Sequence, residues 1–248
     1  MNGGVWVMIS ARLKAFRRFG AALGILLLLL ICSVPVSALY DPHEDALVFY
    51  AARGGKRIAL TFDDGPLTGK TDAILDVLAR YGVRATFFMV GSQAECCPET
   101  ARRVAEAGHE IGNHTSSHKT LRGLTEKQTI AEITKAEKQI YRATGYMPSL
   151  FRPPEGVCTE MLSNVAARTG YGIVLWSVDT FDWRGRSAAQ IEETVLSTVK
   201  GGSVILMHDG IYARSHTAEA LERLIPELRE LGYEFVTVGE LLSPVQTE

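Results

Sequence analysis

Short apolar runs alternate with longer amphipathic stretches along most of this chain, from about residue 57 onward. Apolar runs of roughly four to eight residues, bounded by glycine or polar residues, are typical of buried strands. The sequence predicts seven strands: Ile58–Phe62, Ala85–Val90, Glu110–Asn113, Ser149–Arg152, Ile173–Val178, Ser203–Met207 and Glu234–Val238.

Between these runs, apolar residues recur at helical spacing. The clearest helices are predicted over Thr71–Tyr81, Glu126–Thr144, Ala188–Val199 and Ala218–Leu231. Glycines that suit helix C-termini follow helical runs at positions 82, 108, 145, 170 and 232. This alternation predicts parallel strands joined by crossover helices, which is an α/β fold. The strand count is close to that of a TIM-type barrel but falls short of eight.

The first 38 residues have the pattern of an export signal. Four basic residues precede the apolar stretch Gly20–Ile31, and Val36-Ser37-Ala38 resembles a cleavage site. The apolar stretch is shorter than the roughly 20 residues of a membrane-spanning helix, so cleavage is favoured over retention as an anchor. We therefore expect an exported protein, secreted or extracytoplasmic, with membrane contact only through an uncleaved leader. Residues 39–55 are interpreted as a lead-in segment, and residues 56–248 as one domain.

Composition narrows the possible partners. The 248 residues carry a formal net charge of −2, and the leader holds four basic residues and no acidic one, so the remainder carries −6. An acidic domain without a basic run has no electrostatic basis for nucleic-acid binding. Separately, we expect the protein to be a monomer. After the leader, three cysteines remain, Cys96, Cys97 and Cys158, and the sequence leaves open whether one of the first two pairs with Cys158.

Polar residues follow several predicted strands at the point where each strand ends. Asp63-Asp64 follow the first strand, His114 the third and His208 the sixth. Arg152 ends the fourth strand, and Asp179 and Asp182 follow the fifth. Because the carboxyl ends of parallel strands meet on one face, we expect these side chains to gather there.

Two of these features point to a metal ion. Adjacent carboxylates such as Asp63 and Asp64 repel each other unless a positive charge shares the site. His114 and His118 are four residues apart, so on a helical turn both imidazoles would project from one face. Together with one carboxylate they would form a two-histidine, one-carboxylate site. The alternatives are an ordinary Asp-Gly turn, a capping role for His114 and a surface position for His118.

Five segments occur in a fixed order: Thr-Phe-Asp-Asp-Gly-Pro (61–66), His-Thr-Ser-Ser-His (114–118), Arg-Pro-Pro-Glu-Gly (152–156), Asp-Thr-Phe-Asp-Trp (179–183) and Leu-Met-His (206–208). They resemble the five motifs of the polysaccharide deacetylase family, the NodB-homology domain of carbohydrate esterase family four. The resemblance covers about residues 56 to 242. It implies a distorted (β/α)7 barrel of parallel strands with outer helices, and removal of acetyl groups from sugars with one divalent metal.

Position by position, the resemblance implies that Asp64, His114 and His118 bind the metal. Zinc is the expected ion, with cobalt or nickel as alternatives. Asp63 would be the general base that takes a proton from the attacking water, and Arg152 would orient it. A backbone N–H in the turn after Asp64, at Gly65 or a near neighbour, would stabilise the oxyanion.

On the other side of the reacting bond, His208 would be the general acid, held protonated by Asp182. Trp183 and Leu206 would surround the acetyl methyl group. Pro153 and Glu155 are expected to contact the glycan. Glu155 is a departure, because many relatives carry an aromatic residue there. A carboxylate would hydrogen-bond sugar hydroxyls or repel an acidic substrate, which leaves the polymer open.

The leading prediction is an N-deacetylase acting on N-acetylglucosamine or N-acetylmuramic acid of peptidoglycan, or on chitin oligomers. The same chemistry would also serve O-acetyl ester hydrolysis on xylan. A sugar-binding module without activity is the third alternative. It is disfavoured because Asp63 and His208 are both present.

Overall fold

The computed structural model describes residues 47–48, 55–210 and 216–243. The chain divides into two units, Met1–Asp41 and Pro42–Glu248, and every described residue belongs to the second. The predicted leader, residues 1–38, and most of the lead-in lie outside the described residues. Within the described ranges, no helix combines the length and apolar character needed to cross a membrane.

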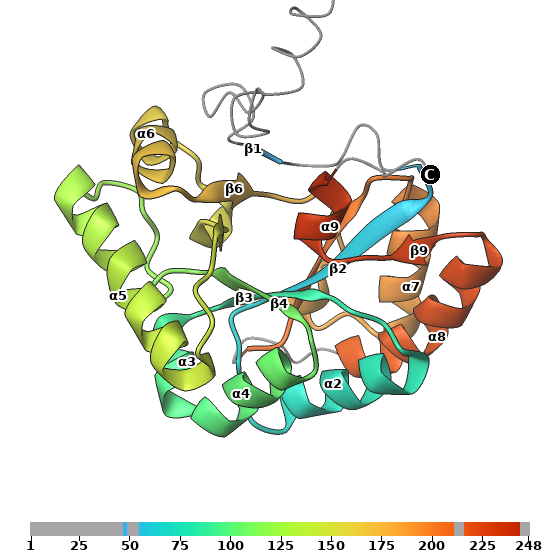
Figure 1. Ribbon diagram of the computed structural model, residues 1–248. Coiled ribbons are helices and arrows are strands. Elements are labelled where there is room, and N and C mark those ends of the chain that lie inside the picture. The colour runs from blue at the N-terminus through green and yellow to red at the C-terminus, as the bar shows by residue number, and fades with distance from the viewer. Residues whose placement is uncertain (1–46, 49–54, 211–215, 244–248) are drawn as a thin grey trace, which may run out of the picture. The chain divides into compact units, whose positions relative to one another are not determined.

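The described strands form one parallel sheet (Figure 1). They are β1 (Leu47–Val48), β2 (Arg57–Asp63), β3 (Thr86–Met89), β4 (Glu110–Asn113), β5 (Leu150–Phe151), β6 (Gly172–Val174), β7 (Val178–Asp179), β8 (Val204–His208) and β9 (Glu234–Phe235). The strand order is β1-β6-β5-β4-β3-β2-β8-β7, and β9 pairs with the start of β2. The predicted α/β class and distorted (β/α)7 arrangement are confirmed.

Helices flank this sheet: most lie on its outer side, and the short last one packs on the inner side against Ala59 and Phe88. They are α2 (Lys70–Tyr81), α3 (Gly91–Cys96), α4 (Pro98–Glu106), α5 (Glu126–Thr144), α6 (Glu160–Thr169), α7 (Ala188–Thr198), α8 (Thr217–Glu230) and α9 (Val238–Leu242). The longer helices pack beside one another in the order α7-α8-α2-α4-α5-α6, which follows the strand order (Figure 1). Two short 3-10 helices, η2 (Pro154–Gly156) and η3 (Asp182–Arg184), follow β5 and β7.

The alternation of side chains along β2 explains how an apolar strand delivers an acid to the site. Successive residues of a strand point to opposite faces. Ile58, Leu60 and Phe62 pack in the core cluster shared with α2 and α8. Thr61 and Asp63 point the other way, where the side chain of Arg152 donates a hydrogen bond to each. The strand is therefore apolar toward the helices and polar toward the interior at its carboxyl end.

The predicted strand Ile173–Val178 is wrong as a single element. It is divided into β6, which pairs with β5 and β1, and β7, which pairs with β8. The carbonyl oxygens of Val174 and Leu175, at the break, accept hydrogen bonds from the guanidinium of Arg152 at 3.2 and 3.0 Å. Strand pairing stops at this break, and the two carbonyls accept hydrogen bonds from the buried guanidinium of Arg152 instead of from a neighbouring strand.

Candidate active site

A pocket of about 360 Å³ opens at the carboxyl ends of the strands. Its walls are formed by Asp63, Asp64, His114, His118, Pro153, Glu155, Trp176, Asp179, Trp183, Leu206 and His208. Nine of the eleven predicted site residues are in this lining. The other two, Arg152 and Asp182, lie directly behind it and hydrogen-bond to Asp63 and His208. The structure thus brings all eleven together.

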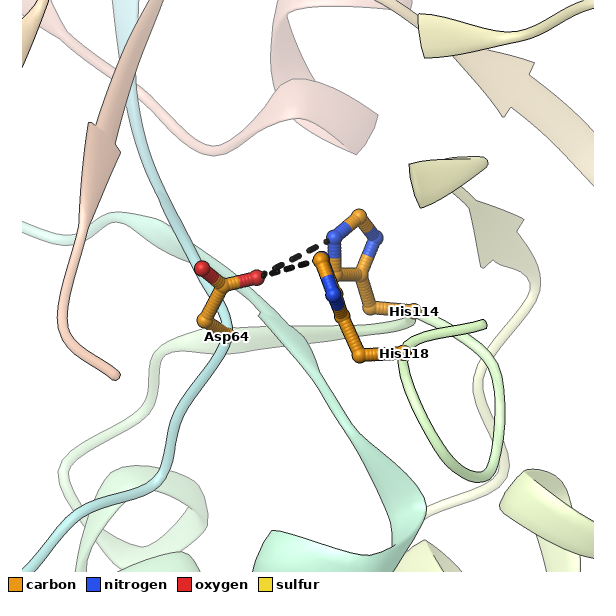
Figure 2. Close-up of side chains that lie close together, drawn as sticks. All are labelled: Asp64, His114 and His118. Atoms are coloured by element: carbon orange, nitrogen blue, oxygen red, sulfur yellow. Dashed lines mark ion pairs between the residues drawn. The ribbon is translucent and has the colours of Figure 1, made fainter. Parts of the chain in front are cut away.

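Asp64, His114 and His118 form a compact cluster of potential ligands. The Oδ1 atom of Asp64 lies 2.9 Å from Nε2 of His118 and 3.4 Å from Nε2 of His114. Figure 2 shows both imidazoles turned toward this one carboxylate oxygen. The ligand atoms all lie within 4.8 Å of one another, which is the spacing expected around a single ion.

The two histidines are not on a helical turn, contrary to prediction. They lie in the loop that follows β4, where Thr115 and His118 have left-handed backbone angles of φ 67° and 55°. The Oδ1 atom of Asn113 accepts a hydrogen bond from the Thr115 N–H at 2.9 Å and supports this turn. The turn, rather than helical periodicity, brings the two rings to a centroid distance of 5.0 Å.

Two observations show that a cation fits among these residues. Asp64 Oδ1 is buried and forms no hydrogen bond of good geometry. His114 donates from Nδ1 to the carbonyl oxygen of Arg152 at 2.7 Å, so the neutral ring presents its Nε2 lone pair to that same carboxylate. Two acceptors that face each other in a buried site need a positive charge between them. A metal ion would satisfy both.

The backbone around Asp64 is tightly specified. Asp64 has φ 77°, and the Gly65–Pro66 peptide bond is cis. Gly210 packs directly on Asp64, because a Cβ at position 210 would lie 2.3 Å from the Cβ of Asp64. Burial raises the pKa of Asp64, but its contacts with His114 and His118 outweigh burial and hold that pKa well below its usual range. The carboxylate therefore stays ionised.

Arg152 fixes the second carboxylate. Its side chain is fully buried and stacks on Phe88, with the guanidinium 4.1 Å from the ring centroid. It donates to Asp63 Oδ1 at 2.7 Å and to Thr61 Oγ1 at 2.8 Å. The other oxygen of Asp63, Oδ2, lies 3.8 Å from Nε2 of His114. Arg152 thus occupies one oxygen of Asp63 and leaves the other facing the ligand cluster.

His208 and Asp182 form a second ion pair beside the pocket. Asp182 is completely buried and accepts from His208 Nδ1 at 2.7 Å and from the His208 backbone N–H at 2.8 Å. Thr217 donates to the same carboxylate at 2.7 Å. Burial lowers the pKa of His208, but the hydrogen bond and charge of Asp182 outweigh burial and raise the pKa to about 9. His208 is therefore protonated at neutral pH.

A family model described as polysaccharide deacetylase matches residues 51–174. The chain belongs to the polysaccharide deacetylase family. It is 42% identical over 200 residues to a peptidoglycan-N-acetylglucosamine deacetylase of Bacillus cereus, covering 80% of this chain and 72% of the relative. It is 40% identical over 190 residues to the peptidoglycan-N-acetylglucosamine deacetylase PgdA of Listeria monocytogenes. That match covers 77% of this chain but only 40% of the relative's length.

Solved structures of polysaccharide deacetylase family members are similar in fold. The Bc1960 peptidoglycan N-acetylglucosamine deacetylase superposes with a TM-score of 0.78 at 37% identity, over 87% of this chain and all of that one. BA3943, a pseudoenzyme of Bacillus anthracis, gives 0.77 at 27% identity, over 85% and 72%. A Clostridium thermocellum acetyl xylan esterase with a cobalt ion gives 0.69 at 35%, over 75% and 90%.

The predicted substrate contacts of this polysaccharide deacetylase family member differ in exposure. Leu206 is nearly buried in the pocket wall, whereas the indole of Trp183 is 42% exposed. Pro153 is buried and leads into the η2 turn, where Glu155 has a left-handed φ of 60° and an exposed side chain. The hydroxyl of Thr120 donates to the Glu155 carboxylate at 3.3 Å.

Asp209 is an important residue that sequence reasoning missed. It is buried, and its carboxylate accepts from the Gly65 N–H at 3.0 Å and from the Thr71 hydroxyl at 2.7 Å. The Gly65 N–H is therefore occupied and is not the free oxyanion donor that was expected. Burial raises the pKa of Asp209 to about 7, and the nearby Asp64 carboxylate adds to the increase. The sequence feature that could have identified Asp209 as a site residue is its position directly after His208, at the end of a strand.

Trp176 and Thr217 were also missed. Trp176 lines the pocket from the segment between β6 and β7, and Thr217 reaches Asp182 from the first turn of α8. Neither lies in one of the five motifs that carried the resemblance. The thiols of Cys96, Cys97 and Cys158, whose pairing the sequence left open, are all free.

Proposed function

We propose that this chain is a metal-dependent hydrolase that removes N-acetyl groups from amino sugars of an extracellular glycan, with peptidoglycan as the first candidate. The observation that carries the proposal is the content of one pocket: a ligand cluster, a carboxylate held by arginine and a protonated histidine. Hydrolysis of an amide needs an attacking water, a base to deprotonate it and an acid for the leaving amine. The pocket contains a group suited to each task.

Asp64, His114 and His118 would hold the metal ion. One carboxylate and two neutral imidazoles suit zinc, with cobalt or nickel as alternatives, and leave coordination positions open. When bound, the ion supplies positive charge that polarises the acetyl carbonyl and makes a water molecule more acidic. The carbonyl oxygen of Arg152 fixes the tautomer of His114 that such binding requires.

Asp63 is the proposed base. Arg152 binds its Oδ1 atom, so Oδ2 is the oxygen available to accept a proton from the attacking water. Because Arg152 also binds Thr61 and two backbone carbonyls, it holds this carboxylate in one orientation. The two adjacent acids thus have different tasks, and their mutual repulsion is offset by the guanidinium on one side and by the ion on the other.

His208 is the proposed acid. Its Nδ1 is engaged by Asp182, so Nε2 is the nitrogen that can donate a proton to the departing amine. The raised pKa keeps that proton in place at neutral pH. A general acid with this geometry typically contributes roughly 10²- to 10⁴-fold in rate. Leu206 and Trp183, which form apolar parts of the wall, would enclose the acetyl methyl group.

Release of acetate tests the proposal. Purified peptidoglycan and N-acetylglucosamine oligomers are incubated with the metal-loaded protein, acetate is measured, and the modified sugar is identified by mass. We expect loss of one acetyl group from glucosamine or muramic acid residues. Absence of acetate from all of these substrates, with metal bound, would contradict the proposal and would favour a sugar-binding module without activity.

A second candidate is O-acetyl ester hydrolysis on xylan, because the chain is 35% identical to an acetyl xylan esterase. Rates on acetylated xylan and on chitin oligomers, measured with one protein preparation, separate the two. A higher kcat/KM on xylan would replace the amide assignment while keeping the same residues in the same roles.

Export is proposed from the leader, whose residues lie outside the described ranges. Mass determination of the mature protein tests it: an N-terminus near residue 39 is expected, and a chain that starts at Met1 would favour the anchor instead. The domain proposed for residues 56–248 corresponds to the part that would then face the glycan.

A further inference from the structure

We propose that Glu155 determines which glycan segments this site accepts: it favours sugars with a free amine beside the N-acetylated residue and disfavours sugars with a carboxylate. This inference rests on the proposed deacetylase function and deepens it by naming the charge of the preferred substrate. It comes from one feature of the pocket, an acidic side chain at its wall that the proposed chemistry does not use.

Apart from Asp179, the other charges in the lining are already compensated. Asp63 is paired with Arg152, and His208 with Asp182. Asp64 faces the two imidazoles of the ligand cluster. Neither lysine nor arginine contributes to the lining. Among the ion pairs of the described part of the chain, none involves Glu155, so its charge is available to a molecule bound in the pocket.

Asp179 is the other unassigned acid of the lining, and it is less available. It is half-buried, and its Oδ1 atom accepts a hydrogen bond from the Phe181 N–H at 2.8 Å. Glu155 is exposed, and the hydroxyl of Thr120 is its hydrogen-bond donor. Between these two carboxylates, Glu155 is the more accessible to a substrate.

A rigid turn presents Glu155. Pro153 and Pro154 precede it, and both Glu155 and Gly156 have left-handed backbone angles, of φ 60° and 65°. Gly156 packs on Trp176, because a Cβ there would lie 2.8 Å from the indole. A charge on a fixed turn acts at a defined place, and its effect on binding is therefore larger than that of a flexible surface acid.

The opposite wall has a different character. In the strand order, β5, which leads to Glu155, and β7, which leads to Trp183, lie on opposite sides of β2. The exposed indole of Trp183 provides an apolar surface, and Arg184 lies over its ring at 4.5 Å, outside the pocket lining. A sugar whose apolar face packs on Trp183 would lie in the same pocket as Glu155. An ammonium on a neighbouring sugar would be attracted there and a carboxylate repelled.

Charge-changing variants test this. Three oligomers of equal length are compared: fully N-acetylated glucosamine, a partly de-N-acetylated form, and an N-acetylglucosamine–N-acetylmuramic acid oligomer with free lactyl carboxylates. In Glu155→Gln, we expect kcat/KM to fall about threefold on the amine-bearing oligomer and to rise about threefold on the carboxylate-bearing one. The neutral oligomer changes least. Glu155→Lys should enlarge both changes, and about 1 M salt should remove them.

Glu160→Gln is the matched control, because it removes the same charge from an exposed position five residues away, outside the pocket lining. It should leave kcat/KM on each of the three oligomers at the wild-type value. If the wild type releases acetate but neither Glu155 variant changes kcat/KM on the charged oligomers relative to the neutral one, the specificity inference is overturned while the proposed function stands. If the wild type releases no acetate from any oligomer, both are overturned.

Discussion

Replacement of Asp182 by asparagine is the most informative single change at this site. The carboxylate is completely buried and accepts three hydrogen bonds, two from His208 and one from Thr217. Asparagine keeps the size and one accepting oxygen but removes the charge. The charge is what holds His208 protonated, so this variant separates the electrostatic role of Asp182 from its packing.

The magnitude follows from the pKa of His208. Burial lowers this pKa, but Asp182, with smaller contributions from Asp63 and Asp64, raises it from its ordinary 6.5 to about 9. The difference between a pKa of 6.5 and one of about 9 corresponds to about 3 kcal/mol in favour of the protonated form of His208. Without the charge of Asp182, burial opposes only the weaker attraction of Asp63 and Asp64, and the pKa should fall toward or below its ordinary 6.5. At about pH 7.5 the protonated fraction then drops from roughly 97% to less than about 10%, so kcat should fall at least about tenfold.

The assay is the pH dependence of kcat for acetate release, with metal saturating. The wild type should lose activity as pH rises toward 9, because the acid loses its proton, and in the variant this limb should move more than one unit toward acid. A bound cation offsets the attraction of Asp63 and Asp64 for the His208 proton. In metal-loaded protein the alkaline limb therefore lies at a lower pH than in metal-free protein, for the wild type and the variant alike. The difference in pH between the wild-type limb and the variant limb remains. An NMR titration of the His208 ring gives the same separation without turnover.

Asp179→Asn is the control, since Asp179 binds the Phe181 N–H and does not contact His208. It should leave the alkaline limb in place. If Asp182→Asn also leaves that limb in place while lowering kcat uniformly, His208 is not the acid that Asp182 keeps protonated, and the assignment of the pair is refuted.

Changes at four further residues test the remaining parts of the site. Asp63→Asn should keep the bound metal while turnover falls by roughly 10²-fold or more, whereas Asp64→Asn should lose the metal; metal content and acetate release, measured together, distinguish them. Arg152→Lys cannot serve all four acceptors of the guanidinium, so unfolding free energy should fall by about 2 to 4 kcal/mol in denaturant titration, with loss of activity; an unchanged midpoint would argue against this network. Asp209→Ala should destabilise by a similar amount because the Gly65 N–H and the Thr71 hydroxyl lose their acceptor, and Asp209→Asn should recover most of the loss; equal losses in both would indicate that charge rather than hydrogen bonding matters.

The sequence was sufficient to predict most of the residues that meet at the site, because they lie at strand ends or shortly after them, and parallel strands end on one face. Asp63 and His208, which are far apart in sequence, are register partners in β2 and β8. Periodicity also gave the bounds of α5 without error and those of α2 within one residue. The spacing of apolar residues thus predicted the bounds of helices that have one apolar face.

What could not be predicted depends on contacts between distant segments. The break between β6 and β7 reflects the demand of Arg152 for backbone acceptors, which no local pattern encodes. The His114–His118 turn depends on left-handed residues that are not glycine. The oxyanion donor was expected at Gly65 or a near neighbour, and no local pattern reveals that the Gly65 N–H is bound by Asp209, 144 residues away. In each case hydrogen bonds between distant segments contribute. At the turn, the backbone N–H groups of Gly91 and Ser92 donate to the carbonyls of Thr115 and Ser116, in addition to the local bond from Thr115 to Asn113.

The central claim is that Asp64, His114 and His118 bind a metal ion on which deacetylation depends. The most direct test measures zinc content and acetate release from N-acetylglucosamine oligomers in one preparation, before chelation, after chelation and after zinc is returned. The account predicts that activity disappears with the metal and returns in proportion to zinc bound, up to one ion per chain. Full activity in protein verified to be metal-free would contradict it.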